Sequence, residues 1–159
     1  MDRIIQPLTQ REFAGFGDVI EHEGDQRRRA LSIDFIDAQD DMRRAFWVSK
    51  VSEAATLPTK VTQLERHPYS DQGFVPLRDT RFLVVVCPDD AKGDPDVERI
   101  KAFVAEPGQG VIYRRNVWHA PLSALTAPAE FFVTMGVTDK ADNDEFFELA
   151  TPLGISSGG

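Results

Sequence analysis

The hydrophobic residues of this chain fall mostly in short runs, separated by turns rich in glycine, proline and charged residues. The run at residues 80–87 is continuous and β-branched, which is typical of a strand buried on both faces. Further strands are predicted at residues 4–8, 19–20, 31–36, 46–51, 60–67, 111–119, 129–137 and 145–149. Many short strands of this kind predict an all-β fold, either a barrel or a sandwich.

Two segments have the pattern of a short helix. A Thr-x-x-Glu capping box that starts at Thr9 predicts a helix that turns Phe13 and Phe16 inward. Asp94 is followed by proline, as at many helix starts, and apolar residues up to Val104 then recur at helical spacing. We therefore expect one or two short helices packed on the sheets.

Composition restricts the class of protein. A chain of 159 residues and 17.8 kDa fits a single domain over residues 1–159, with residues 155–159 expected to form a frayed tail. The net charge of −8 argues against a nucleic-acid partner. No apolar leader opens the chain and no apolar run reaches membrane-spanning length, so we expect a cytoplasmic protein with a small-molecule substrate. The single cysteine, Cys87, predicts a buried structural thiol.

The segment Tyr113–Leu122 gathers two guanidiniums, an amide, an indole and an imidazole directly after a glycine-rich turn. A mixed polar and aromatic cluster of this kind suits a small anionic ligand. Arg115 offers a bidentate fork for a carboxylate, with Tyr113, Asn116 and, from an earlier segment, Gln72 as further candidates for substrate binding. On one continuous strand Arg115 and His119 would share a face, because they are separated by an even number of positions.

A second group of polar residues lies at the end of the strand predicted at residues 60–67. Glu65 and His67 would project to the same side of this strand, and a turn at residues 68–71 would bring Gln72 back beside them. His119 would supply a fourth group from a later strand. The four side chains are candidate ligands of a divalent metal. Alternatively, His67, His119 and Glu65 are catalytic acid–base groups, and both alternatives stay open.

These two clusters carry a resemblance to known proteins. The spacing Glu65-x-His67-x4-Gln72 resembles the first motif of cupin barrels, and Pro107-Gly108 leading to His119 resembles the second. More narrowly, residues 64–77 and 110–122 are similar to the ureidoglycolate lyase family. The matching pieces are Leu64-Glu65-Arg66-His67-Pro68, Gln72-x-Phe74-x-Pro76-Leu77, Gly110-Val111 and Tyr113-x-Arg115-Asn116-Val117-Trp118-His119-x-Pro121-Leu122, with weaker matches at Pro7-Leu8 and Phe16-Gly17-Asp18-Val19-Ile20.

The resemblance implies a cupin-like β-barrel of the jelly-roll type that works as a homodimer. It implies a lyase that splits ureidoglycolate into glyoxylate and urea in allantoin degradation, a branch of purine catabolism. Nickel or manganese is the candidate metal. Two features depart from the family pattern: Ala120 stands where the family has a second histidine, and residues 30–48 lack a clear counterpart of an Arg-aromatic-His-Asp segment. The alternative is therefore a non-catalytic or differently specific cupin that binds a small carboxylate, such as a ureido or hydroxy acid.

Overall fold

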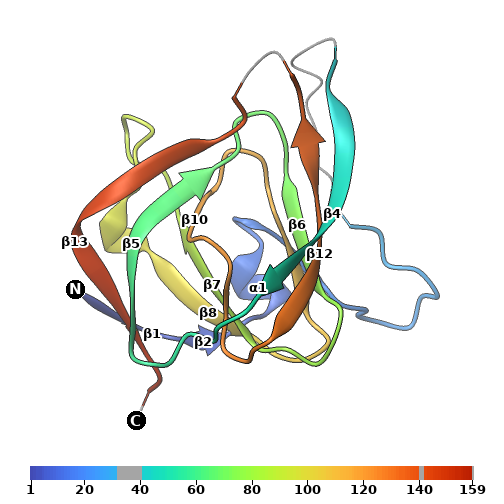
Figure 1. Ribbon diagram of the computed structural model, residues 1–159, viewed down its shortest axis with the longest axis horizontal. Coiled ribbons are helices and arrows are strands. Elements are labelled where there is room, and N and C mark those ends of the chain that lie inside the picture. The colour runs from blue at the N-terminus through green and yellow to red at the C-terminus, as the bar shows by residue number, and fades with distance from the viewer. Residues whose placement is uncertain (32–40, 140–141, 159) are drawn as a thin grey trace.

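The computed structural model describes residues 1–31, 41–139 and 142–158. Two curved sheets face one another and form a nearly closed barrel (Figure 1). The prediction of an all-β barrel with one or two short helices is confirmed. The strand predicted at residues 31–36 lies almost wholly outside the described residues. Among the described residues, none forms a helix long and apolar enough to cross a membrane.

The barrel contains a larger and a smaller sheet. The larger sheet runs in the order β1 (Asp2–Ile4), β13 (Glu145–Ser156), β5 (Thr59–Arg66), β10 (Trp118–His119), β7 (Phe82–Cys87), β8 (Lys101–Ala105) and β2 (Gln6–Pro7), and β11 (Ser123–Ala124) also pairs with β7. The smaller sheet runs in the order β3 (Gly17–Ile20), β9 (Gly110–Tyr113), β6 (Gln72–Pro76), β12 (Ala129–Val137) and β4 (Arg43–Val51). The helical pieces are α1 (Gln10–Phe13) and the 3₁₀ turn η1 (Val97–Arg99).

The core has two parts, one on each face of the larger sheet. The inner core lies between the two sheets, and the outer core covers the other face of the larger sheet. Alternate side chains of β7 go to each: Val84 and Val86 join the inner core, while Val85 and Cys87 join the outer core. All six residues of β7 are buried, so the prediction of a strand buried on both faces is confirmed.

The first predicted helix is present as α1. Thr9 is its N-cap, and the Thr9 hydroxyl accepts a hydrogen bond of 3.3 Å from the Glu12 backbone N–H. This bond satisfies one of the amides that a helix start leaves without an intrahelical partner. Phe13 is fully buried and Phe16 packs against the inner core, as the sequence predicted.

The prediction of a second helix at residues 94–104 is wrong. The segment forms only the three-residue turn η1 and then β8, which pairs antiparallel with β7 over five residues. Four consecutive residues, Ala102–Ala105, are buried, and a short run that is apolar on every face fits a central strand as well as a helix. The segment forms a strand because its backbone hydrogen-bonds to the edge of β7.

The prediction of a frayed tail at residues 155–159 is also wrong for its first two residues. Strand β13 continues to Ser156, and Ile155 is fully buried in the outer core. Ile155 is in register with Thr59 of β5 on one side and with Arg3 of β1 on the other. Residues 154–156 are therefore held between two strands, whereas Ser157 and Gly158 lie beyond β13 and are exposed.

Candidate active site

Three strands of the barrel bring the predicted ligands together. Glu65 lies on β5, and His67 follows directly after that strand. His119 lies on β10, in register with Glu65 on one side and with Val86 of β7 on the other. Since Val86 points into the inner core, His119 faces the barrel interior as well. One ligand atom from each of Glu65, His67 and His119 lies within 4.8 Å of the others.

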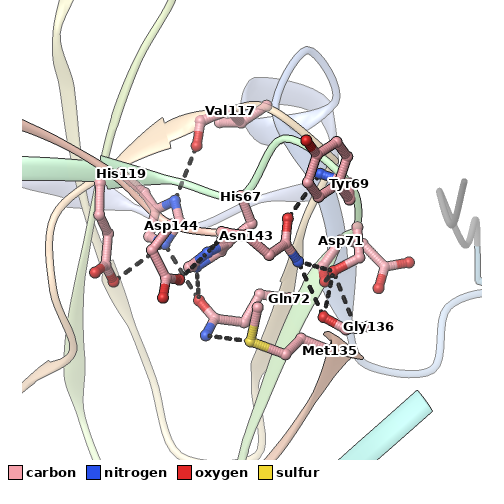
Figure 2. Close-up of polar contacts among 12 residues, drawn as sticks. His67, Tyr69, Asp71, Gln72, Val117, His119, Met135, Gly136, Asn143 and Asp144 are labelled. Atoms are coloured by element: carbon pink, nitrogen blue, oxygen red, sulfur yellow. Dashed lines mark hydrogen bonds and ion pairs between the residues drawn. The ribbon is translucent and has the colours of Figure 1, made fainter. Parts of the chain in front are cut away.

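Gln72, at the start of β6, completes the cluster. Its Oε1 lies 2.9 Å from Nε2 of His67 and 3.3 Å from Nε2 of His119 (Figure 2). Its Nε2 donates to the sulfur of Met135 at 3.6 Å. The structure thus brings together all four residues that the sequence indicated as candidate ligands.

Hydrogen bonds on the far side of each imidazole determine its tautomer. Nδ1 of His119 lies 2.9 Å from the Val117 carbonyl oxygen, and Nδ1 of His67 lies 2.9 Å from the Asn143 carbonyl oxygen. A carbonyl oxygen can only accept, and so can Oε1 of Gln72 on the other side of each ring. At His119 the Nδ1 contact is the shorter one, and at His67 the Nδ1 has a second acceptor in Oδ1 of Asp144, so we assign the proton of each ring to Nδ1. With its proton on Nδ1, each ring presents the lone pair of its Nε2 toward Gln72. A carboxylate, an amide oxygen and two imidazole lone pairs converge, which is an arrangement that attracts a proton or a cation.

Burial and the neighbouring rings set the charges of this cluster. Burial lowers the pKa of His119 below its ordinary value of 6.5, although the hydrogen bond with Glu65 acts in the opposite direction. Burial alone would raise the pKa of Glu65, but the hydrogen bond and positive charge that a protonated His119 would offer, together with attraction to His67, bring it below 4.5. Glu65 Oε1 and His119 Nε2, which are 3.5 Å apart, are therefore the two alternative positions of one proton. Because Glu65 is partly exposed and His119 fully buried, we assign an ionised Glu65 and a neutral His119 at neutral pH.

Two residues that contact His67, Asn143 and Asp144, were not among the predicted site residues. Nδ1 of His67 lies 2.9 Å from Oδ1 of Asp144, in addition to the Asn143 carbonyl oxygen (Figure 2). In the sequence, these two residues belong to an acidic stretch that ends at Asp144 and has the pattern of a solvated loop. Their separation of 76 and 77 positions from His67 leaves no local signal that could have indicated the contact.

The strand predicted at residues 111–119 is interrupted, which corrects one inference about the site. Strand β9 ends at Tyr113, and a turn follows in which Asn116 has a φ of 66°. Arg115 therefore does not share a strand face with His119. Its Nη1 instead donates to the Pro68 carbonyl oxygen at 3.0 Å, one residue after His67.

The remaining candidates for substrate binding are placed differently from the histidines. Tyr113 is buried and its ring stacks on that of His119, with centroids 4.2 Å apart and an interplanar angle of 10°. The backbone N–H of Asn116 donates to the His67 carbonyl oxygen at 2.9 Å. Arg115 and Asn116 line a cavity of about 420 Å³ that also touches Arg114 but not the four clustered residues.

The departure from the family pattern at Ala120 lies outside this cluster. Ala120 packs against the outer core, whereas His119 faces the interior. Its backbone N–H donates to the Val85 carbonyl oxygen at 2.9 Å, which keeps the segment on the edge of β7. The absence of a histidine at position 120 therefore removes no donor from the group formed by Glu65, His67, Gln72 and His119.

Comparison with known proteins agrees with the resemblance seen in the motifs. A family model described as ureidoglycolate lyase matches residues 2–155. A protein of Burkholderia mallei named ureidoglycolate lyase is 42% identical over 137 residues, which cover 81% of this chain and 79% of that protein. One of Brucella anthropi with the same name is 37% identical over 162 residues, covering 97% and 94%. A solved 3,4-ketoisomerase from Helicobacter canadensis is 11% identical with a TM-score of 0.43, over 82% of this chain and 86% of that one. The chain belongs to the ureidoglycolate lyase family.

Proposed function

We propose that this protein is a lyase that cleaves ureidoglycolate into glyoxylate and urea. Family membership along nearly the whole chain supports this activity. The structural observation that carries the proposal is the convergence of Glu65, His67, Gln72 and His119 inside the barrel. These side chains supply the proton acceptor and the polar groups that the reaction needs.

The substrate is a carbinolamide, in which a hydroxyl and a urea nitrogen share the carbon next to a carboxylate. Cleavage removes the hydroxyl proton, converts the C–O bond to C=O, breaks the C–N bond and places a proton on the departing nitrogen. The neutral His119 is the proposed base, because the Val117 carbonyl holds its Nδ1–H and leaves the Nε2 lone pair available. Glu65, 3.5 Å away, stabilises the imidazolium until His119 returns the proton to the urea nitrogen.

The same donor set fits a divalent metal, with nickel and manganese as the candidate ions. The fit rests on the two Nε2 lone pairs and the Glu65 carboxylate, which lie within 4.8 Å of one another, and on Oε1 of Gln72 beside them. When bound there, the ion would supply Lewis-acid polarisation of the substrate's hydroxyl. Elemental analysis of protein purified without chelator tests this part of the proposal.

Arg115 remains the proposed partner of the substrate carboxylate. Its hydrogen bond to the Pro68 carbonyl oxygen keeps the guanidinium next to the turn that carries His67. Arg114 offers a matched control, because this neighbouring arginine is exposed and donates to the Ala14 and Gly15 carbonyl oxygens. Arg115→Ala should raise KM much more than Arg114→Ala does, and equal KM values for the two variants would refute this role.

The deciding assay measures glyoxylate release from ureidoglycolate by the purified protein, with and without added nickel or manganese. Release that is lost in His119→Asn supports the proposal, and no release under either condition refutes it. The second candidate is a module that binds a small carboxylate without cleaving it, and the divergent residues 30–48 favour it. Thermal stabilisation by glyoxylate without turnover of ureidoglycolate would establish this alternative.

We further propose a cytoplasmic homodimer that acts in allantoin degradation. An exposed apolar face on β4 and β12 supports the dimer: Phe46 is 62% exposed, and its ring stacks on that of Phe132 at 5.7 Å. Val48 lies in register with Phe132 on the same face. Light scattering on the native protein and on Phe132→Lys tests the dimer, since a monomeric native protein would refute it.

A further inference from the structure

The segment at residues 142–144 holds His67 from the side opposite Gln72. The Nδ1 proton of His67 faces two acceptors at 2.9 Å, the Asn143 carbonyl oxygen and Oδ1 of Asp144. His67 is only 4% exposed, whereas the Asp144 side chain is 47% exposed. A half-exposed carboxylate thus contacts a buried imidazole. Figure 2 shows Asp144 and Asn143 beside His67.

The side chain of Asn143 fixes the position of this segment. Its Oδ1 accepts from the Tyr69 backbone N–H at 2.7 Å, and its Nδ2 donates to the Gly136 carbonyl oxygen at 2.9 Å and to the Ser70 hydroxyl at 3.2 Å. One buried amide therefore ties the turn that follows His67 to strand β12. These three hydrogen bonds hold the residue whose carbonyl oxygen faces Nδ1 of His67.

We propose that Asn143 and Asp144 are positioning residues for His67. They keep the imidazole in its Nδ1–H tautomer and fix the direction of its Nε2 lone pair toward Gln72 and the cluster. In the other tautomer, Nε2–H would donate to Oε1 of Gln72, and the lone pair would be lost from the site. The proposal rests on the proposed function, in which Nε2 of His67 is one of the two imidazole donors beside Gln72.

The effect of Asp144 should fall on chemistry rather than on stability. An ion pair with a half-exposed carboxylate contributes little to the free energy of unfolding. By contrast, groups that orient an active imidazole from behind typically change activity or metal affinity roughly 10–100-fold when removed. Asp144 does not belong to the cluster that would meet the substrate, so KM should change less than kcat.

The test compares Asp144→Ala and Asp144→Asn with Asp142→Ala, a matched control that removes an exposed carboxylate from the same segment. Long-range ¹H–¹⁵N spectra of the histidine rings report the tautomer of His67 directly, and kcat and KM are measured in parallel. We expect Nδ1–H in the native protein. In Asp144→Ala the Asn143 carbonyl oxygen is the one remaining acceptor of the two described at Nδ1, so we expect a partial population of Nε2–H and a kcat roughly 10–100-fold lower. Asp144→Asn should restore most of kcat, because its amide oxygen still accepts, and Asp142→Ala should match the native protein.

An Nε2–H tautomer in the native protein would overturn the proposal, as would an Asp144→Ala variant with native kcat and native ring spectra. The spectra need no turnover, so they separate this inference from the proposed function. If the native protein releases no glyoxylate but His67 changes tautomer in Asp144→Ala, the positioning role stands and the lyase function fails. Turnover that is unaffected in all three variants refutes only the positioning role.

Discussion

Replacing Tyr113 distinguishes two roles for this residue, substrate binding through its hydroxyl and support of His119 through its ring. The ring is 5% exposed, stacks on His119 and makes edge contacts with Phe13 and Phe74 at 6.0 and 6.1 Å. Burial, together with the charge of Glu65, raises the pKa of Tyr113 well above its ordinary value of 10, so the group stays a neutral phenol. These contacts favour the supporting role.

The expected magnitudes follow from what each substitution removes. Tyr113→Phe keeps every ring contact and should cost less than about 1.5 kcal/mol of unfolding free energy. Tyr113→Ala removes the whole ring and should cost about 3–5 kcal/mol, of which the stack on His119 accounts for about 0.5–1.5 kcal/mol. Tyr113→Leu, which fills more of the space, provides a folded variant without a flat ring.

Urea denaturation and glyoxylate release measure the two consequences on the same preparations. Tyr113→Phe should keep the native kcat, whereas Tyr113→Leu should lose turnover because the His119 ring is no longer held by a parallel face. A Tyr113→Phe variant as impaired as Tyr113→Leu would refute the supporting role. That result would return the hydroxyl to the substrate-binding role that the sequence suggested.

Three further predictions concern thiol chemistry, acid stability and a buried ion pair. Burial raises the pKa of the Cys87 thiol from 9.0 to about 12, so its thiolate fraction at pH 8 is roughly a thousandfold lower; a thiol reagent should react only as the protein unfolds, and labelling at the rate of a free thiol would contradict this. Unfolding free energy measured in urea should fall as the pH drops below 6.5, because the unfolded chain protonates the imidazole that buried His119 keeps neutral; the lowered pKa of Glu65 adds a loss of the same sign below 4.5. His119→Asn should flatten the upper part of this profile, and an unchanged slope would show that another group titrates. Arg44→Met removes a guanidinium 2.6 Å from Asp71, whose side chain is 3% exposed. Because Arg44 is itself a quarter exposed, we expect the unfolding free energy to fall by about 3 kcal/mol. The double variant Arg44→Met with Asp71→Asn should recover part of this loss in thermal denaturation.

Local patterns predicted much of the fold and the four clustered residues. The spacing of Glu65 and His67 at the end of one strand and the turn before Gln72 are short-range features, and this turn leads directly from β5 of the larger sheet to β6 of the smaller sheet. Burial of β7 on both faces could also be predicted locally, because its continuous apolar run suits a strand that has protein on both sides. Long-range pairing was harder to predict. The segment before Ala105 has apolar residues at helical spacing, but it forms β8 because it pairs with β7.

The parts of the site that could not be predicted depend on backbone geometry or distant contacts. The turn after Tyr113 requires a positive φ at Asn116, a conformation that asparagine tolerates but that its presence alone does not demand. This turn moved Arg115 away from the face of His119. The contact of Asp144 with His67 exists only after β12 and β13 have packed on the barrel, so it has no signature in either segment alone.

The burial of strand β7 limits which substitutions this sequence can accept during evolution. Its six side chains all lie in one core or the other, and its backbone pairs with β8 on one edge and with β10 and β11 on the other edge. A polar replacement at any of these positions would lose hydrophobic burial and place a dipole where water does not reach. β7 should therefore accept few substitutions beyond exchanges among aliphatic residues, and its amides should be among the last to exchange with deuterium.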